Sequence, residues 1–154
     1  MSMEKTLSVT AINNGTVIDH IPAGQAITIL RLLKLVDHKN QVTIGLNLSG
    51  NRGFKDLIKM ENRYLTDREM HEIAIFAPNA TINTIKDFKV IKKHKALLPE
   101  SVIDIMRCPN PRCVTQNEPL KTCFDLYKHN EIIKLRCKYC EKTFLREEVK
   151  EYVA

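Results

Sequence analysis

Four cysteines near the C-terminal end of the 154-residue chain have the spacing of metal ligands. Cys108 and Cys113 form a C-x4-C pair, and Cys137 and Cys140 form a C-x2-C pair after 23 intervening residues. Each pair can hold one side of a tetrahedral ion, and Zn²⁺ suits four thiolates because it has no preferred d-electron geometry and no redox chemistry. A site closed by four thiolates leaves no position for water, so it would stabilise structure and would not catalyse. The pattern predicts one structural zinc ion per chain; two disulfides or four ordinary buried thiols are the alternatives.

The composition is that of a folded protein of mild basicity. The chain is 44% hydrophobic and 27% charged, with a formal net charge of +6. Four thiolates and one Zn²⁺ would change this to 6 − 4 + 2 = +4, which favours a solvated cationic surface over a nucleic-acid footprint. No apolar run reaches membrane-spanning length, and no apolar signal core follows the first residues. We therefore expect a cytoplasmic protein with neither membrane nor nucleic acid as partner, where cysteines remain reduced.

The periodicity of the first hundred residues predicts strands alternating with two helices. One helix has an apolar face at Ala26, Ile29, Leu30 and Leu33, with Pro22 in its first turn. The other helix follows a capping box at 66–69 and carries apolar residues at helical spacing. This order favours a ferredoxin-like antiparallel sheet with two helices on one face, in an α+β fold. Strands are expected at 7–11, 42–48, 54–61, 81–85 and 88–91, the last ending in the cationic run 92–95.

A linker around 96–100 divides the expected domains, 1–98 and 99–154. The second domain should be a small zinc-ribbon-like β domain, with strands near Phe124, Ile133 and Thr143. About fifty residues cannot bury a large core, so the second domain should depend on its metal for folding. Cys123 has no partner at this ligand spacing and is interpreted as a half-buried structural thiol.

No local motif supports an enzyme: paired carboxylates, a glycine-rich phosphate loop and a nucleophile elbow are all missing from the sequence. A binding site is possible if the ferredoxin-like sheet brings Asp19, His20, Lys59 and Lys93 to one end. Lysines there could bind phosphates as point charges, and an aspartate could accept hydrogen bonds from ribose hydroxyls. Each of these lysines is also explained as a solvated strand residue.

Several stretches together resemble the regulatory chains of aspartate carbamoyltransferase. They are Gly-Thr-Val-Ile-Asp-His-Ile-Pro at 15–22, Ile-Gly-Leu-Asn-Leu at 44–48, Lys-Asp-Leu-Ile-Lys at 55–59 and the four cysteines. The resemblance runs almost end to end and implies a non-catalytic subunit. Its N-terminal domain would bind CTP and ATP as allosteric effectors, with UTP as a further candidate, and would pair with a second regulatory chain. Its zinc domain would dock on catalytic chains of pyrimidine biosynthesis, in a dodecamer of two catalytic trimers and three regulatory dimers.

The same resemblance implies an effector pocket on the first domain. Asp19 and Lys59 would hold the ribose, and Lys93 would meet the phosphates. The backbone carbonyls of Ile12 and Phe88 would accept from the exocyclic amine that cytosine and adenine share. The full set implied by the resemblance is Val9, Ala11, Ile12, Val17, Asp19, His20, Leu57, Lys59, Asn83, Ile85, Phe88, Val90 and Lys93.

A zinc-ribbon nucleic-acid-binding protein is the alternative from a different functional class. Zinc ribbons often have that role, and the chain is basic. Against it, the chain has no Trp and only 6% aromatic residues, so it lacks the aromatic platform on which bases stack.

Overall fold

The computed structural model describes residues 11–37 and 39–153, and the chain divides into two compact units, 1–96 and 97–154. The strand expected at 7–11 lies outside the described residues except for Ala11, which is not in a strand. Within the described part of the chain, no helix is both long and apolar enough to cross a membrane.

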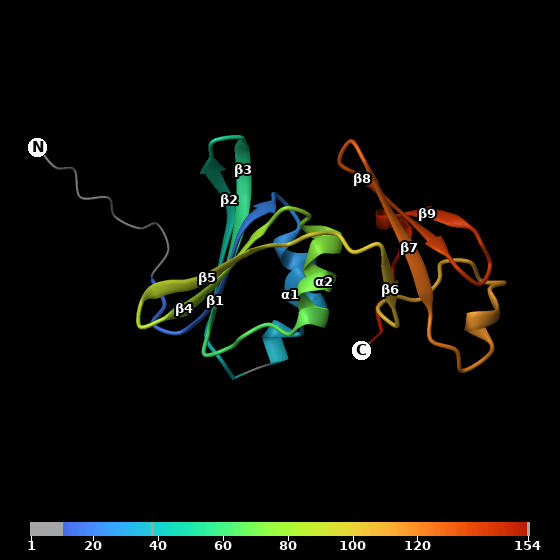
Figure 1. The fold of residues 1–154 in the computed structure, drawn as a ribbon, viewed down its shortest axis with the longest axis horizontal. Coiled ribbons are helices and arrows are strands. Elements are labelled where there is room, and N and C mark those ends of the chain that lie inside the picture. Colours follow the sequence, from blue (N-terminus) through green and yellow to red (C-terminus); the bar gives the residue numbers. More distant parts are fainter. Residues whose placement is uncertain (1–10, 38, 154) are drawn as a thin grey trace, which may run out of the picture. The chain divides into compact units, whose positions relative to one another are not determined.

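The first unit is a five-stranded antiparallel sheet in the order β2-β3-β1-β4-β5, with both helices on one face (Figure 1). Four of the strands and the two helices follow the β-α-β-β-α-β order, so the ferredoxin-like prediction is confirmed, with β5 added at one edge. The elements are β1 (Gly15–Pro22), α1 (Ala26–Leu32), a 3-10 helix (Leu35–Asp37), β2 (Val42–Gly50), β3 (Gly53–Glu61), α2 (Asp67–Phe76), β4 (Thr81–Lys86) and β5 (Lys89–Lys95).

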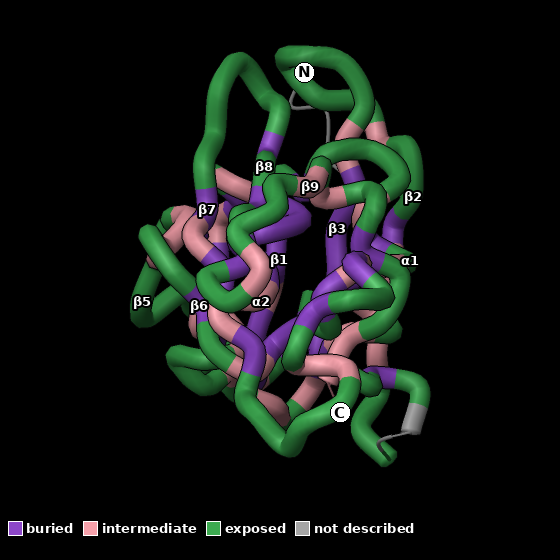
Figure 2. Tube along the Cα trace, turned by 90° about the vertical axis from the view of Figure 1, so that its right-hand side faces the viewer, coloured by how far each residue is buried: buried purple, intermediate pink, exposed green. Residues whose placement is uncertain are grey.

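The core lies between the sheet and the helices. Ile18 of β1 faces Ile58 of β3 on one side and Ile82 of β4 on the other, and all three are almost fully buried. Ile29 of α1 and Ile73 of α2 are completely buried as well. Figure 2 shows β1 and β3 buried along much of their length, whereas the edge strand β5 is exposed.

The prediction that Pro22 lies in the first turn of a helix is wrong. Pro22 is the last residue of β1, and α1 begins four residues later. Asp19 and His20 lie inside β1. His20 has a positive φ of 58° at a bulge, where the pairing of β1 with β3 shifts register. The bulge restores the inward direction of Ile21, so this strand buries its apolar side chains on both sides of the irregularity.

A buried carboxylate, and not Pro22, stabilises the start of α1. Asp56 is fully buried, and its Oδ2 accepts hydrogen bonds from the backbone N–H groups of Gly24 (2.9 Å) and Ala26 (3.2 Å). Its Oδ1 accepts from the N–H of Asn47 (3.0 Å), which lies at a bulge of β2 with φ 55°. One side chain therefore joins the beginning of α1 to the irregular part of β2.

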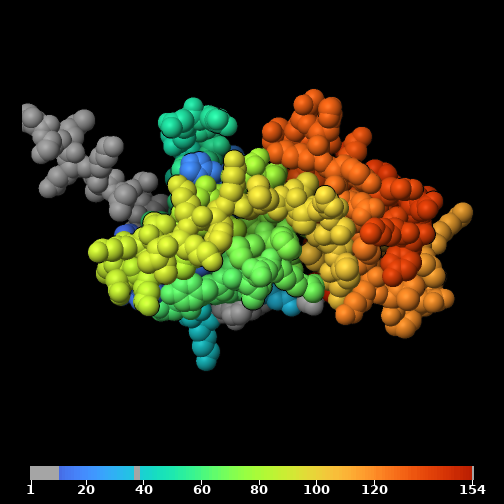
Figure 3. Space-filling model, viewed as in Figure 1, coloured from blue at the N-terminus to red at the C-terminus, as the bar shows by residue number. Residues whose placement is uncertain are grey.

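The predicted strand at 88–91 is displaced towards the C-terminus. Asp87 and Phe88 form a tight turn with φ of 52° and 63°, as a two-residue hairpin loop requires. The cationic run 92–95 lies within β5 and does not follow it. An edge strand exposes its side chains to water, so lysines fit there and discourage pairing with further strands. The side chains of this segment lie at the molecular surface in Figure 3.

The second unit is a four-stranded antiparallel sheet in the order β6-β7-β8-β9. Its inward side chains Phe124, Leu126, Ile133 and Leu135 are buried. Together with the four cysteines they form a small core, and the predicted α+β fold with a β-rich cysteine domain is confirmed. The elements are β6 (Ser101–Ile103), a 3-10 helix (Val114–Gln116), β7 (Cys123–His129), β8 (Ile132–Cys137), β9 (Thr143–Leu145) and a 3-10 helix (Arg146–Glu148).

The capping box of α2 is confirmed and is part of a larger link. Thr66 Oγ1 accepts from the N–H of Glu69 (3.2 Å), and Glu69 Oε1 accepts from the N–H of Thr66 (3.1 Å). The guanidinium of Arg63 donates to Glu69 Oε2 (2.6 Å) and to the carbonyl of Leu33 (3.3 Å). Arg63 thereby connects the cap of α2 to Leu33 at the C-terminal end of α1.

Replacing Thr66 with alanine should lower the free energy of unfolding of the first unit by about 1 kcal/mol, because the N–H of Glu69 loses its acceptor. Urea unfolding followed by circular dichroism measures the change. The matched control is Ser49→Ala, at an exposed position of β2, which should change stability by less than about 0.5 kcal/mol. Equal stabilities for the two variants would contradict the role of the cap.

Candidate functional site

The structure brings the four predicted metal-ligating sulfurs together. The Sγ atoms of Cys108, Cys113, Cys137 and Cys140 all lie within 4.8 Å of one another. Cys108 Sγ is 3.7 Å from Cys140 Sγ, and Cys113 Sγ is 3.8 Å from Cys137 Sγ. A tetrahedron with zinc–sulfur bonds of about 2.3 Å has sulfur–sulfur edges of about 3.8 Å. A disulfide bond would need about 2.05 Å. All five cysteines are free thiols, so the geometry fits a four-thiolate metal site and not two disulfides.

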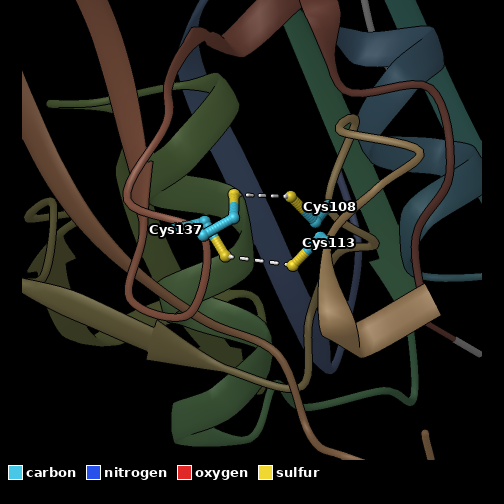
Figure 4. Close-up of side chains that lie close together, drawn as sticks. Cys108, Cys113 and Cys137 are labelled. Carbon is cyan, nitrogen blue, oxygen red and sulfur yellow. Dashed lines mark hydrogen bonds between the residues drawn. The ribbon is translucent and has the colours of Figure 1, made fainter. Parts of the chain in front are cut away.

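The first cysteine pair is held by its own loop. The N–H of Cys113 donates to the carbonyl of Asn110 (3.1 Å), closing a turn between the two sulfurs. The Gln116 amide donates to the carbonyls of Cys108 and Asn110. Figure 4 shows the sulfurs of Cys113 and Cys137 directed towards each other, with Cys108 beside them. The loop therefore contributes its own hydrogen bonds to the placement of both cysteines of this pair.

The second cysteine pair follows directly from the end of β8. The N–H of Cys137 donates to the carbonyl of Lys142 (3.0 Å), and the N–H of Glu141 donates to the carbonyl of Cys137 (2.9 Å). The N–H of Lys138 donates to the backbone carbonyl of Cys123 (2.9 Å). Cys123 is half-buried and lies outside the four-sulfur cluster, so its contribution here is a backbone bond that fixes the second cysteine pair.

Burial makes two of these sulfurs poor sites for a bare thiolate. Cys108, Cys113 and Cys137 are nearly inaccessible to solvent, and burial raises the pKa of the Cys108 and Cys137 thiols. Burial also opposes ionisation of Cys140. Hydrogen bonds from the backbone of Lys142 and from neighbouring groups outweigh it, however, and lower its pKa to about 7. A cation must therefore displace protons from the buried thiols, which makes metal binding dependent on pH.

The predicted effector residues lie mostly on the face of the first sheet that the helices leave uncovered. Lys59 of β3 is directly opposite Val17 of β1, Val17 is opposite Asn83 of β4, and Asn83 is opposite Lys93 of β5. Residues directly opposite each other in antiparallel strands project to the same side. The next row, which contains Ile18, projects to the helix side. Four predicted residues thus form one row across four strands of the open face.

Four more predicted residues share that face. Asp19 lies two positions after Val17, and Leu57 two positions before Lys59, so each has the same orientation as its neighbour. Ile85 is paired with Gly15 of β1 and with Val90 of β5, which places Ile85 and Val90 on the open side as well.

The remaining predicted residues lie beside the row or outside the described chain. Ala11 and Ile12 precede β1, and Ile12 is buried. Phe88 lies in the β4–β5 turn, where its N–H donates to the carbonyl of Asn13 (2.9 Å). That bond brings the turn next to the segment containing Ile12, the two places where a base-reading carbonyl is expected. His20 lies at the β1 bulge, with its Nδ1 3.3 Å from Thr81 Oγ1; Val9 lies outside the described residues.

The structure adds Lys55, which the sequence reasoning missed. Lys55 Nζ is 2.8 Å from Asp19 Oδ1, and both side chains are about one-quarter exposed. The alternation Lys55, Leu57, Lys59 along β3 was the signal that places it on the open face. Partial burial raises the pKa of Asp19, but hydrogen bonds from Lys55 and from the His20 N–H outweigh it, so the pKa is below its usual value.

Lys59 lies on β3 at one end of the row and is only 9% exposed. Burial lowers the pKa of its amine, and the Asp19 carboxylate partly opposes that shift. A buried ammonium is stabilised by a nearby anion. With Lys55, Lys93 and Lys95 on the same side and Asp19 among them, the open face is suited to an anionic ligand that also carries hydroxyl groups.

Replacing Cys113 with serine should abolish stoichiometric metal binding and unfold the second unit, because the four-thiolate site loses a ligand and the small core depends on the bound metal. Metal content by mass spectrometry and amide signals of the second unit by NMR report both effects. Cys123→Ser is the matched control, since it removes a thiol outside the cluster and should keep one metal per chain. An intact second unit without metal in Cys113→Ser would refute this dependence.

Comparison with known proteins covers both units. Residues 7–97 match the family model described as aspartate carbamoyltransferase regulatory chain, allosteric domain, and residues 100–150 match its metal binding domain. The chain is 51% identical to the aspartate carbamoyltransferase regulatory chain of Chromobacterium violaceum over 150 residues, covering 97% of this chain and 99% of that one. It is 46% identical to that of Aeromonas hydrophila over 152 residues (98% and 99%) and 49% identical to that of Neisseria gonorrhoeae over 146 residues (94% and 96%). The chain therefore belongs to the aspartate carbamoyltransferase regulatory chains, non-catalytic subunits with an allosteric domain and a metal-binding domain.

Proposed function

We propose that this regulatory chain binds CTP or ATP on the open face of its first sheet and transmits the effect to catalytic chains through its metal-binding domain. The observation that carries the proposal is the row Lys59, Val17, Asn83 and Lys93, in which strand register aligns two lysines and an amide across four strands. Membership of the family implies catalytic-chain partners and displaces the alternative of a nucleic-acid-binding zinc ribbon.

The chemistry of the open face supports a nucleoside triphosphate. Lys93 lies on the exposed edge strand, where it would meet the phosphates, and the half-buried Asp19 would accept from the ribose with Lys59 beside it. The Asp19–Lys55 ion pair would be exchanged in part for ribose and phosphate contacts. Such an exchange costs little because a partly exposed ion pair contributes little by itself.

Base selection would depend on backbone carbonyls near Ile12 and Phe88. A carbonyl accepts from the amino group that cytosine and adenine share and cannot accept from the corresponding uracil carbonyl. We therefore propose CTP and ATP as direct ligands, with UTP as a companion to CTP.

We propose Zn²⁺ as the ion of the four-cysteine cluster. The sulfur–sulfur distances of 3.7 and 3.8 Å match a tetrahedral zinc–thiolate centre, and four thiolates are the soft ligands that zinc accepts. A cytoplasmic location would keep the thiols reduced. With all four positions filled by Cys108, Cys113, Cys137 and Cys140, the ion would support structure and have no open position for catalysis.

Of the two edges of the first sheet, one is suited to pairing with a second copy of the chain. The β2 edge, Val42–Gly50, has no charged side chain, and Leu46 on it is 47% exposed. The β5 edge carries Lys89, Lys92, Lys93 and Lys95, which repel a second copy. We propose that two chains associate through the β2 side, and that three such dimers join two catalytic trimers.

The regulatory effect requires a coupling free energy. A nucleotide shifts the enzyme only when it binds the regulatory chain differently in the low- and high-activity quaternary states. Typical couplings are about 1–3 kcal/mol. A ligand that bridges β1, β3, β4 and β5 would change the rigidity of the whole sheet, including its β2 edge.

Replacing Lys93 with alanine should weaken CTP and ATP binding at least about tenfold, because one charge-assisted contact to phosphate is lost. Isothermal titration calorimetry of the regulatory chain measures the dissociation constants. Lys92→Ala is the matched control: it removes the same charge from the adjacent residue, which pairs with Thr84 and projects to the other side of the strand. Lys92→Ala should bind within about twofold of the wild type.

Equal weakening by both substitutions would mean that only net charge matters, and no weakening by Lys93→Ala would remove it from the phosphate site. Either result would contradict the proposed placement of the nucleotide.

Mixing the chain with the aspartate carbamoyltransferase catalytic trimer of its own organism should give a complex with the mass of two trimers and three regulatory dimers. Light scattering coupled to size-exclusion chromatography measures the mass, with and without a thiol reagent that removes the metal. Metal removal should release free trimers. Assembly that persists without metal would rule out a metal-dependent docking domain.

A further inference from the structure

The last residues of the described chain run beside the segment that leads into Cys108. Met106 forms an antiparallel bridge with Tyr152. The N–H of Arg107 donates to the carbonyl of Glu151 (3.0 Å), and the N–H of Val153 donates to the carbonyl of Ile105 (2.9 Å). These bonds form a short ladder immediately before the first cysteine of the cluster. We call residues 149–153 the tail clasp.

The same segment is held on its other side by one residue before β7. The N–H of Asp104 donates to the carbonyl of Thr122 (2.8 Å), and the Thr122 hydroxyl donates to the carbonyl of Met106. Ile105 and Met106 are 4% and 1% exposed. The residues that position Cys108 are therefore fixed between Thr122 and the tail clasp.

Apolar burial and backbone bonds hold the tail clasp in place. Val149 is 6% exposed. The Tyr152 ring is largely buried, and that burial raises the pKa of its hydroxyl to about 12. The ion pair between Arg107 and Glu151 (3.2 Å) is exposed on both sides and contributes little.

Two hollows give access to the backbone around Cys108, and the tail clasp contributes to the walls of both. One, of about 330 Å³, is lined by Arg107, Cys108, Lys150 and Glu151 among others. The other, of about 340 Å³, is lined by Arg107, Cys108 and Tyr152 among others. Displacing the clasp would remove a wall from each hollow, so a competing ligand would reach the Cys108 side of the cluster.

We propose that the tail clasp controls the exchange of the bound metal by holding Cys108 in the cluster and by forming part of the wall of the two hollows beside it. The inference rests on the proposed zinc site but not on effector binding. Metal loss to a chelator would proceed by breaking the metal–sulfur bond of Cys108 while a chelator donor atom forms a bond to the metal. The freed thiolate would then take a proton from water. The clasp slows the step because the hydrogen bonds of Ile105 and Arg107 to the tail restrict movement of the backbone that carries Cys108.

The test is the rate at which the zinc-loaded full-length chain loses Zn²⁺ to 4-(2-pyridylazo)resorcinol, followed by absorbance. A chain ending at Lys150 loses both backbone bonds and the Tyr152 ring, and it should release zinc at least about tenfold faster. Tyr152→Ala keeps the backbone and should release zinc at an intermediate rate. Glu151→Gln, which removes only the exposed ion pair, is the control and should stay within about twofold of the wild type.

Equal release rates for the wild type, the shortened chain and Tyr152→Ala would overturn the proposal. If the shortened chain retains no zinc during purification, the comparison of Tyr152→Ala with Glu151→Gln decides, and equal rates for these two overturn it. CTP binding to each variant is measured in parallel. Faster zinc release with unchanged CTP affinity supports the clasp, whereas loss of CTP binding in all chains, wild type included, bears only on the effector site.

Discussion

β1 is hydrogen-bonded between β3 and β4, and its register decides which side chains each face of the first sheet presents. Ile18 meets Ile58 and Ile82 on the face that the helices cover, while Val17 meets Lys59 and Asn83 on the open face. A shift of β1 by one residue would turn Ile18 to the open face and Val17 towards the helices. Formation of the core and alignment of the polar row are therefore one event. The energy of the apolar contacts fixes the geometry of the polar residues.

The cysteine cluster shows what sequence can predict when chemistry alone sets the spacing. Two short pairs of thiols predict a four-sulfur site without any knowledge of the strands, because each pair needs only a local turn. The open face is different. Its residues come from four strands, and these strands also contain two bulges, one at His20 and one between Thr84 and Ile85. Bulges have weak sequence signals, so alternation alone does not predict the full face. The expected sheet suggested Lys59 and Lys93, and the family resemblance implied Val17 and Asn83.

The errors in the predicted elements have local physical causes. Proline fits a first helical turn, and for that reason the sequence predicts Pro22 in a helix. A strand end serves equally well, since the missing N–H then costs no ladder bond. The start of α1 depends instead on Asp56, which is thirty residues from Ala26 in sequence. No local pattern could have revealed that long-range cap. The sequence did not point to Lys55 for a related reason: its role depends on an ion pair with Asp19, which lies on another strand.

The two edges of the first sheet differ in charge, and this difference limits how many further copies can pair with the sheet edge to edge. A sheet with two pairable edges can add copies without limit, as fibrils do, whereas a sheet with one such edge stops at two. Charge on β5 leaves β2 as the pairable edge of the described sheet. The same lysines that suit β5 to an anionic ligand would then also prevent further copies from pairing with this edge. Neutralising these lysines, by substitution or by chemical acetylation, would leave both edges of the sheet able to pair. The solubility of the chain would then be at risk.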